Sequence, residues 1–357
     1  MSHRHTHDAV VVGAGPNGLA AAITLAQAGR SVLVLEAQPT IGGGVRSAEL
    51  TLPGFVHDVC SAVHPLAAST PFFRSLPLEQ HGLSWIHSPA AMCHPFDDGP
   101  PAMLRTSIEE TSATLGTDGR SYDRLVRPFV ERWDDLAADA LAPLHPPRHP
   151  FLLGRFGLVG LRSVHSLAKS RFDFEPARGL LAGLGAHAIT PLTYAATASI
   201  ALVLDVAAHR SGWPIPAGGA QRISDALASY LRSLGGEIVS DSVVRTLADV
   251  PDARTVLLDV TPRQAIAIAG DRFTTRYRRA LERYRYGAGV CKVDWALSAP
   301  VPWRDAECAD AATMHLGGTL DEITASEAAP WRGEHADKPF VLAALGYTAF
   351  ALALTRG

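Results

Sequence analysis

The sequence predicts an α/β fold, with a Rossmann-like, doubly wound parallel sheet and a second region of mixed α+β structure. The first observation behind this is a strand–turn–helix–strand pattern in residues 8–36, DAVVVGAGPNGLAAAITLAQAGRSVLVLE. The second is the run TVLLDV at residues 255–260, which is apolar enough for a strand buried on both faces of a parallel sheet. The third is composition, because 47% hydrophobic and 19% charged residues in a chain of 357 indicate a globular protein with about two domains.

The first unit divides into clear elements. Three valines at residues 10–12 predict a buried strand, and the turn Gly13-Ala14-Gly15-Pro16-Asn17-Gly18 follows. The Ala- and Leu-rich residues 19–28 predict a helix, and Gly29 stands where a left-handed residue would end it. Residues 31–35 predict a second buried strand, which Glu36 closes.

This turn has the glycine spacing of a dinucleotide-binding site. Gly13 allows a tight turn, Gly15 allows the backbone to approach a pyrophosphate, and Gly18 allows the helix to pack closely on the strand. The helix N-terminus offers free N–H groups to phosphates, and the Glu36 carboxylate can accept both hydroxyls of the adenosine ribose. The alternative is a glycine-rich turn that binds nothing, and the ordered strand, helix, second strand and acid argue against it.

A second glycine cluster follows at once, Ile41-Gly42-Gly43-Gly44-Val45-Arg46-Ser47. This continuation resembles the FAD-containing amine oxidase and phytoene desaturase superfamily, in which the acid is followed by paired glycines and an arginine beside the flavin phosphates. A guanidinium suits that position because its donors match phosphate oxygens. The resemblance implies FAD as the cofactor, held by Gly13, Ala14, Gly15, Pro16, Asn17, Gly18, Glu36, Ala37, Gly43, Arg46 and the backbone of Val244.

The stretch GFVHDVCSAVHP, residues 54–65, narrows the resemblance to the phytoene-desaturase-like group that includes pyridine nucleotide-disulphide oxidoreductase domain-containing protein 2. His57 and Asp58 are candidate acid/base residues in this stretch, with local hydrogen bonding as the alternative. The stretch lacks HxxxH or HxH spacing, so no metal site is expected. Related flavin oxidases bring a strand lysine close to the flavin, which makes Lys292, in the alternating run 290–297, a third candidate.

The rest of the chain predicts a substrate domain and a return to the nucleotide sheet. Residues 83–104 predict hairpins, residues 107–115 and 122–140 predict helices, and the apolar helices of 152–208 suit either a hydrophobic substrate or a plain core. A helix at 220–234 and a strand at 237–247 follow. The resemblance implies an FAD-binding domain of residues 1–75 and 212–265 and a substrate domain of 76–211 and 266–344. It also implies that 345–357 is an aberrant tail of a C-terminally truncated chain.

Charge and cysteine usage exclude several other classes of function. The net charge is −3, so we expect no nucleic-acid partner, and the Arg-rich residues 272–285 predict a solvated helix face. The four cysteines are widely spaced without a CxxC pair, which argues against a zinc site and a redox-active disulfide. With no signal peptide, this predicts a cytoplasmic protein. No apolar run is long enough to span a membrane, whereas peripheral membrane contact and the oligomeric state stay open.

Together these features predict FAD-dependent oxidation of an apolar small molecule, with hydride transferred from substrate to flavin. The prediction agrees with the absence of a recognisable Ser/His/Asp or Cys/His triad in the sequence. Two alternatives remain open. One is an NAD(P)-linked reductase that uses the same turn, and the other is a catalytically inactive, truncated FAD-binding protein.

Overall fold

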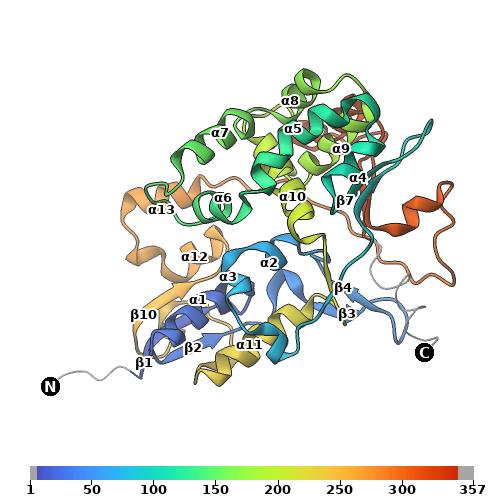
Figure 1. Ribbon diagram of the computed structural model, residues 1–357. Coiled ribbons are helices and arrows are strands. Elements are labelled where there is room, and N and C mark those ends of the chain that lie inside the picture. The colour runs from blue at the N-terminus through green and yellow to red at the C-terminus, as the bar shows by residue number, and fades with distance from the viewer. Residues whose placement is uncertain (1–5, 345–357) are drawn as a thin grey trace.

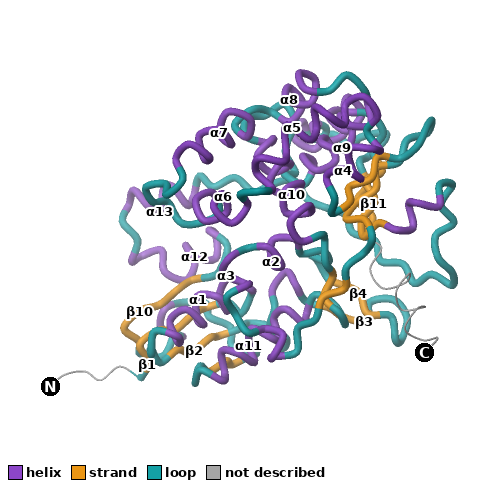
Figure 2. Tube along the Cα trace, in the orientation of Figure 1, coloured by secondary structure: helices purple, strands orange, loops and turns teal. Residues whose placement is uncertain are grey.

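The computed structural model describes residues 6–344 and is organised around two four-stranded sheets. Figure 1 and Figure 2 show one sheet at the lower left and the other at the right, with a layer of helices above. The predicted tail, residues 345–357, lies outside the described residues.

The first sheet is parallel throughout and has the strand order β10-β1-β2-β9. Its strands are β1 (His7–Val12), β2 (Val32–Leu35), β9 (Glu237–Val239) and β10 (Ala253–Leu258). Helices α1 (Pro16–Gln27) and α11 (Gln221–Ser233) pack on the face that carries Val11 and Val34. Helix α12 (Pro262–Ala269) packs on the opposite face, against Val12. Helices on both faces of a parallel sheet confirm the predicted Rossmann-like α/β fold.

The second sheet is mixed and has the order β12-β11-β6-β7. Only the β11–β6 pair is parallel. Its strands are β6 (Ala90–His94), β7 (Ala102–Arg105), β11 (Ala311–Leu316) and β12 (Val341–Ala344). Met92 and Leu104 face the helical layer, whereas Met103 and Met314 form a separate small core on the other face.

The helical layer holds the largest hydrophobic core, which includes Tyr122, Phe129 and Trp133. Its helices are α4 (Ile108–Thr114), α5 (Gly119–Val130), α6 (Trp133–Ala140), α7 (Pro150–Gly160), α8 (Val164–Arg171), α9 (Glu175–Ala186) and α10 (Thr197–Ser211). Ser107 caps α4 by accepting the N–H of Glu110, as its position before the helix predicts.

One short hairpin, one antiparallel pair of strands from distant parts of the sequence and four further helices complete the fold. They are β3 (Ser47–Glu49) with β4 (Val56–Asp58), β5 (Trp85–Ile86) with β8 (Ile215–Pro216), α2 (Pro65–Ser69), α3 (Pro71–Arg74), α13 (Thr275–Glu282) and α14 (Leu320–Ala328). Helix α13 carries the Arg-rich segment and has no buried residue, so the predicted solvated face is confirmed.

Two sequence predictions are wrong. The strand expected over 237–247 ends at Val239, because the chain turns at Asp241, which has a left-handed φ of 54°. The alternating run 290–297 forms no strand, and Val290 and Val293 are 73% and 68% exposed. An alternating run forms a strand only where the edge of a sheet is available to pair with it. Within residues 6–344, no strand pairs with the run 290–297.

Candidate dinucleotide-binding site

The glycines of the first turn have separable roles. Gly13 has a φ of 108°, and a Cβ there would overlap the carbonyl oxygen of Asp259. A Cβ on Gly18 would overlap the carbonyl oxygen of Gly13. The nearest atom to a Cβ on Gly15 would be Asp259 Oδ2, at an ordinary 3.4 Å. Folding therefore requires glycine at positions 13 and 18, whereas the surroundings of Gly15 accommodate a side chain.

The turn leaves backbone donors free at the N-terminus of α1. The N–H groups of Gly15 and Asn17 make no hydrogen bond within residues 6–344, and Pro16 has no N–H to satisfy. Unpaired N–H groups and the positive end of the helix dipole favour an anion at this point. The turn is thus suited to a phosphate group.

Glu36 lies at the carboxyl end of β2, and the residue is only 9% exposed. Its Oε2 accepts the N–H of Ala14 at 2.9 Å, and its Oε1 accepts the N–H of Gln38 at 3.0 Å. Each carboxylate oxygen can accept more than one hydrogen bond, so both retain capacity for a ribose hydroxyl. The backbone bonds therefore fix the carboxylate beside the glycine turn.

The second glycine cluster packs directly on the first. The N–H of Gly42 donates to the carbonyl oxygen of Ala14 at 2.9 Å. A Cβ on Gly43 would lie only 3.3 Å from the Cα of Gly15. Arg46 follows, and its Nε donates to the carbonyl oxygen of Gly43 at 3.0 Å. The two glycine segments, distinct in the sequence, thus form one continuous backbone surface.

Asp259 is a site residue that the sequence interpretation missed. It follows β10, and its Oδ2 accepts the N–H of Gly18 at 2.7 Å. Burial, and secondarily the charge of Glu36, raises the pKa of its carboxyl group. A usable signal was present, since the carboxyl ends of neighbouring parallel strands meet at one edge of a sheet.

The three catalytic candidates lie near one another, beside β3 and β4. Nδ1 of His57 lies 3.7 Å from Oδ1 of Asp294, and Lys292 forms an ion pair with the same aspartate. Asp58 accepts the Ser47 hydroxyl at 2.6 Å and the N–H of Ala220 at 2.7 Å. Burial raises the pKa of the Asp58 carboxyl group, although the hydrogen bonds from Ser47 and Ala220 act in the opposite direction.

Asp58 therefore has a clear structural role, because it joins β3 to the start of α11. Asp294, which sequence reasoning did not select, links His57 to Lys292. A catalytic role for any of these residues stays a prediction.

The remaining predicted contacts lie along the same edge. Val244 is partly buried against Val10 and Leu35 on the face opposite α1. Ala37 is exposed directly after Glu36. Across the described chain, no three His, Cys, Asp or Glu side chains are grouped to hold a metal ion. Within residues 6–344, no helix combines the length and apolar character needed to cross a membrane.

Comparison with known proteins relates the segment that carries the glycine turn to a described domain family. Residues 11–76 match the NAD(P)-binding Rossmann-like domain family. The chain is 25% identical over 281 residues to pyridine nucleotide-disulfide oxidoreductase domain-containing protein 2 of Rattus norvegicus, covering 67% of this chain and 48% of that protein. The mouse protein is 26% identical over 286 residues, with the same coverage. The chain is homologous to these proteins. It spans about half the length of these curated relatives.

Other relatives extend the comparison to enzymes with named substrates. A segment of 115 residues is 32% identical to a limonene dehydrogenase chain of Castellaniella defragrans, covering 32% of this chain and 21% of that protein. Putrescine oxidase bound to putrescine superposes with a TM-score of 0.54 and 23% identity, over 79% of this chain and 64% of that one. Cyclohexylamine oxidase from Brevibacterium oxydans superposes with a TM-score of 0.50 and 18% identity, over 78% of this chain and 63% of that one. The chain therefore shares the fold of the amine oxidases, and the predicted resemblance is confirmed.

Proposed function

We propose that this chain binds FAD and serves an oxidoreductase that takes hydride from an apolar small molecule. The observation that carries the proposal is the environment of Gly15. No contact within the fold requires glycine there, yet two unpaired N–H groups and the Glu36 carboxylate surround the position. A site that must admit a pyrophosphate against the backbone explains all three features.

The second glycine cluster favours FAD over NAD(P). The matched domain family is described by NAD(P) binding, which the first turn alone would also fit. The packing of Gly43 on Gly15 extends the backbone surface beyond the adenosine half of a dinucleotide. Arg46 then adds a guanidinium whose terminal N–H groups make no hydrogen bond within the described residues. Such an extended, cationic continuation supports the longer flavin nucleotide.

In this proposal each residue has a defined task. Glu36 orients the ribose, the N–H groups of Gly15 and Asn17 bind the pyrophosphate, and Arg46 neutralises phosphate charge. FAD, when bound, supplies the hydride acceptor. The relationship to the limonene dehydrogenase chain supports an apolar substrate, because the compound in that name is a hydrocarbon. We further propose a cytoplasmic location. We also propose an FAD-binding domain made of residues 1–75 and 212–265 and a substrate domain made of residues 76–211 and 266–344.

The test measures nucleotide binding directly. Denatured protein should release FAD on chromatography, and calorimetric titration should show saturable FAD binding. Gly15→Val should abolish binding because the side chain would occupy the pyrophosphate position. Glu36→Ala should weaken binding by about 1–3 kcal/mol through loss of a charged acceptor for the ribose.

Gly287→Val is the matched control, since a Cβ at that exposed position meets nothing within 4 Å. Circular dichroism should show the same helix content in all variants. Bound NAD without flavin in folded protein would contradict the proposal. Unchanged FAD affinity in both site variants would contradict it equally.

A further inference from the structure

Helix α7 presents large apolar side chains to solvent. Phe151, Leu158 and Leu161 are 93%, 79% and 69% exposed. Their spacing places them along one side of the helix. Leu144, in the turn that leads into α7, is fully exposed as well. Isolated exposed leucines are ordinary, but several exposed apolar side chains on one side of a helix mark an interaction surface.

The opposite side of α7 is anchored in the core. Leu152 and Phe156 are buried, and the ring of Phe156 packs edge-on against Phe129 at 5.4 Å between centroids. The helix therefore carries apolar side chains on both sides while only one side is covered. An amphipathic surface helix would instead carry polar residues outward.

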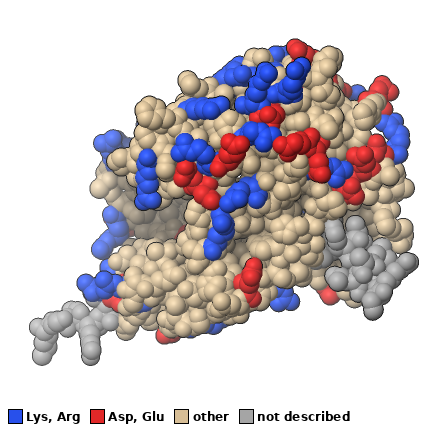
Figure 3. Space-filling view, in the orientation of Figure 1, with Lys and Arg blue, Asp and Glu red and all other residues tan. Residues whose placement is uncertain are grey.

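The charge of the same segment is strongly one-sided. Residues 141–172 contain Arg148, Arg155, Arg162, Lys169 and Arg171 and no Asp or Glu, in a chain whose net charge is −3. Figure 3 shows Lys and Arg gathered along the upper edge of the molecule, where Figure 1 places α7 and α8. None of the four arginines forms an ion pair within residues 6–344, whereas Lys169 pairs with Asp321.

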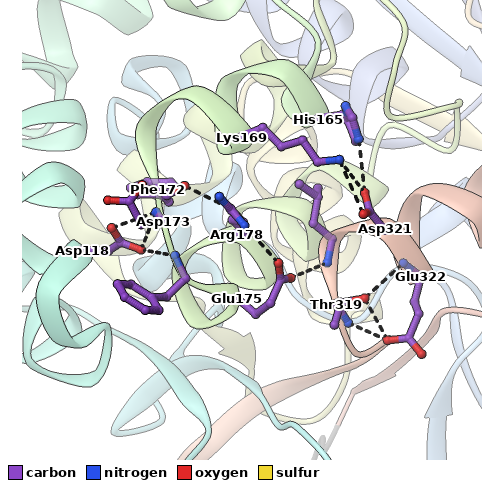
Figure 4. Close-up of polar contacts among 12 residues, drawn as sticks. Asp118, His165, Lys169, Phe172, Asp173, Glu175, Arg178, Thr319, Asp321 and Glu322 are labelled. Carbon is purple, nitrogen blue, oxygen red and sulfur yellow. Dashed lines mark hydrogen bonds and ion pairs between the residues drawn. The ribbon is translucent and has the colours of Figure 1, made fainter.

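The turn that joins α8 to α9 is held by hydrogen bonds within the chain. Figure 4 shows the Asp118 carboxylate accepting the N–H group of Asp173, at 3.0 Å. The same carboxylate accepts the N–H group of Phe174 at 2.8 Å. Arg178 donates to the carbonyl oxygen of Phe172 at 3.0 Å. These bonds fix the turn between α8 and α9, which exposes 55% of Phe174.

We infer that the α7 face, defined by Phe151, Leu158 and Leu161 with Arg148 and Arg155, docks on an anionic lipid bilayer. The apolar side chains would enter the boundary between headgroups and acyl chains, while the arginines would contact lipid phosphates. A second copy docking through the same face would bring like charges together. A nucleic acid would use the arginines but would leave the apolar stripe unexplained. The inference is independent of the cofactor.

The experiment is co-sedimentation of the full chain with vesicles. We expect binding to vesicles of mixed phosphatidylcholine and phosphatidylglycerol, weakening with added salt, and much weaker binding to phosphatidylcholine alone. The double variant Phe151→Ser with Leu158→Ser should lower the partition coefficient at least tenfold. Arg155→Gln should lower it about fivefold.

The double variant Val290→Ser with Val293→Ser is the matched control, because these valines are also largely exposed and lie outside the α7 face, and its binding should be unchanged. All variants change surface residues, and thermal denaturation should confirm that they fold. No binding to either vesicle would overturn the inference, as would vesicle binding that Phe151→Ser with Leu158→Ser retains. If the chain binds duplex DNA and the Phe151→Ser with Leu158→Ser variant retains that binding, the face belongs to a nucleic acid and the inference is wrong. If the chain self-associates in sedimentation velocity and the same variant abolishes the association, the face belongs to a second copy and the inference is wrong.

Discussion

Mild acid should destabilise this protein because its second sheet buries neutral histidines. His94 on β6 and His315 on β11 are completely buried, and His187 follows α9. His94 Nε2 contacts the carbonyl oxygen of Gly318 at 2.7 Å, and His187 Nε2 lies 3.2 Å from His315 Nε2. Glu175 is the acid whose charge raises the pKa of His94. Its influence is smaller than the cost of burying an imidazolium.

The expected loss of stability follows from the pKa values. Burial lowers the pKa of His94 and of His187 from 6.5 to about 4. Burial also lowers the pKa of His315, well below its ordinary value. At His94 and His187 the unfolded chain therefore binds protons more tightly than the folded chain, so their contribution to stability is full above about pH 6.5, falls as the pH drops, and stops falling below about pH 4. At about pH 5 each of the first two histidines should remove about 2 kcal/mol from the free energy of unfolding.

The assay is urea unfolding followed by tryptophan fluorescence at about pH 7 and about pH 5. His94→Gln keeps a donor for the Gly318 carbonyl oxygen but cannot be protonated, so it should remove about 2 kcal/mol of the pH dependence. His335→Gln changes an exposed histidine and should leave that dependence intact. Equal free energies of unfolding at the two pH values would refute the reasoning. So would a pH dependence that His94→Gln leaves unchanged.

Three further predictions concern the fold. Tyr122→Phe should lower the free energy of unfolding by about 3 kcal/mol, measured by urea titration, because the buried Asp205 carboxylate would lose the hydroxyl 2.6 Å away. Gly18→Ala should lower the melting temperature in a thermal scan, whereas Gly15→Ala should not, because only the first substitution overlaps backbone. In a thiol assay with a chromogenic disulfide, the exposed Cys60 and Cys291 should react in the native protein. The buried Cys93 and Cys308 should react only after unfolding, because the reagent cannot reach them and because burial raises the pKa of the Cys93 thiol.

Much of the site is encoded locally and could be predicted. The strand, glycine turn, helix and second strand of residues 8–36 depend on neighbours within one unit, and the structure forms them with Gly29 left-handed at φ 73°. The position of Glu36 at a strand end follows from the same pattern. Such elements are predictable because apolar periodicity and glycine conformation act over a few residues.

The tertiary structure decided which distant segments complete the site. Asp259 meets Gly18 across 241 residues, and Asp294 joins His57 to Lys292. Cys93 and Cys308 lie 3.2 Å apart although their spacing suggested no pairing. The run 290–297 alternates like a strand but pairs with no strand among residues 6–344. These outcomes depend on the path of the chain between the sheets. Packing decides which distant residues become neighbours after a long connection, and such contacts leave no periodic pattern in the sequence.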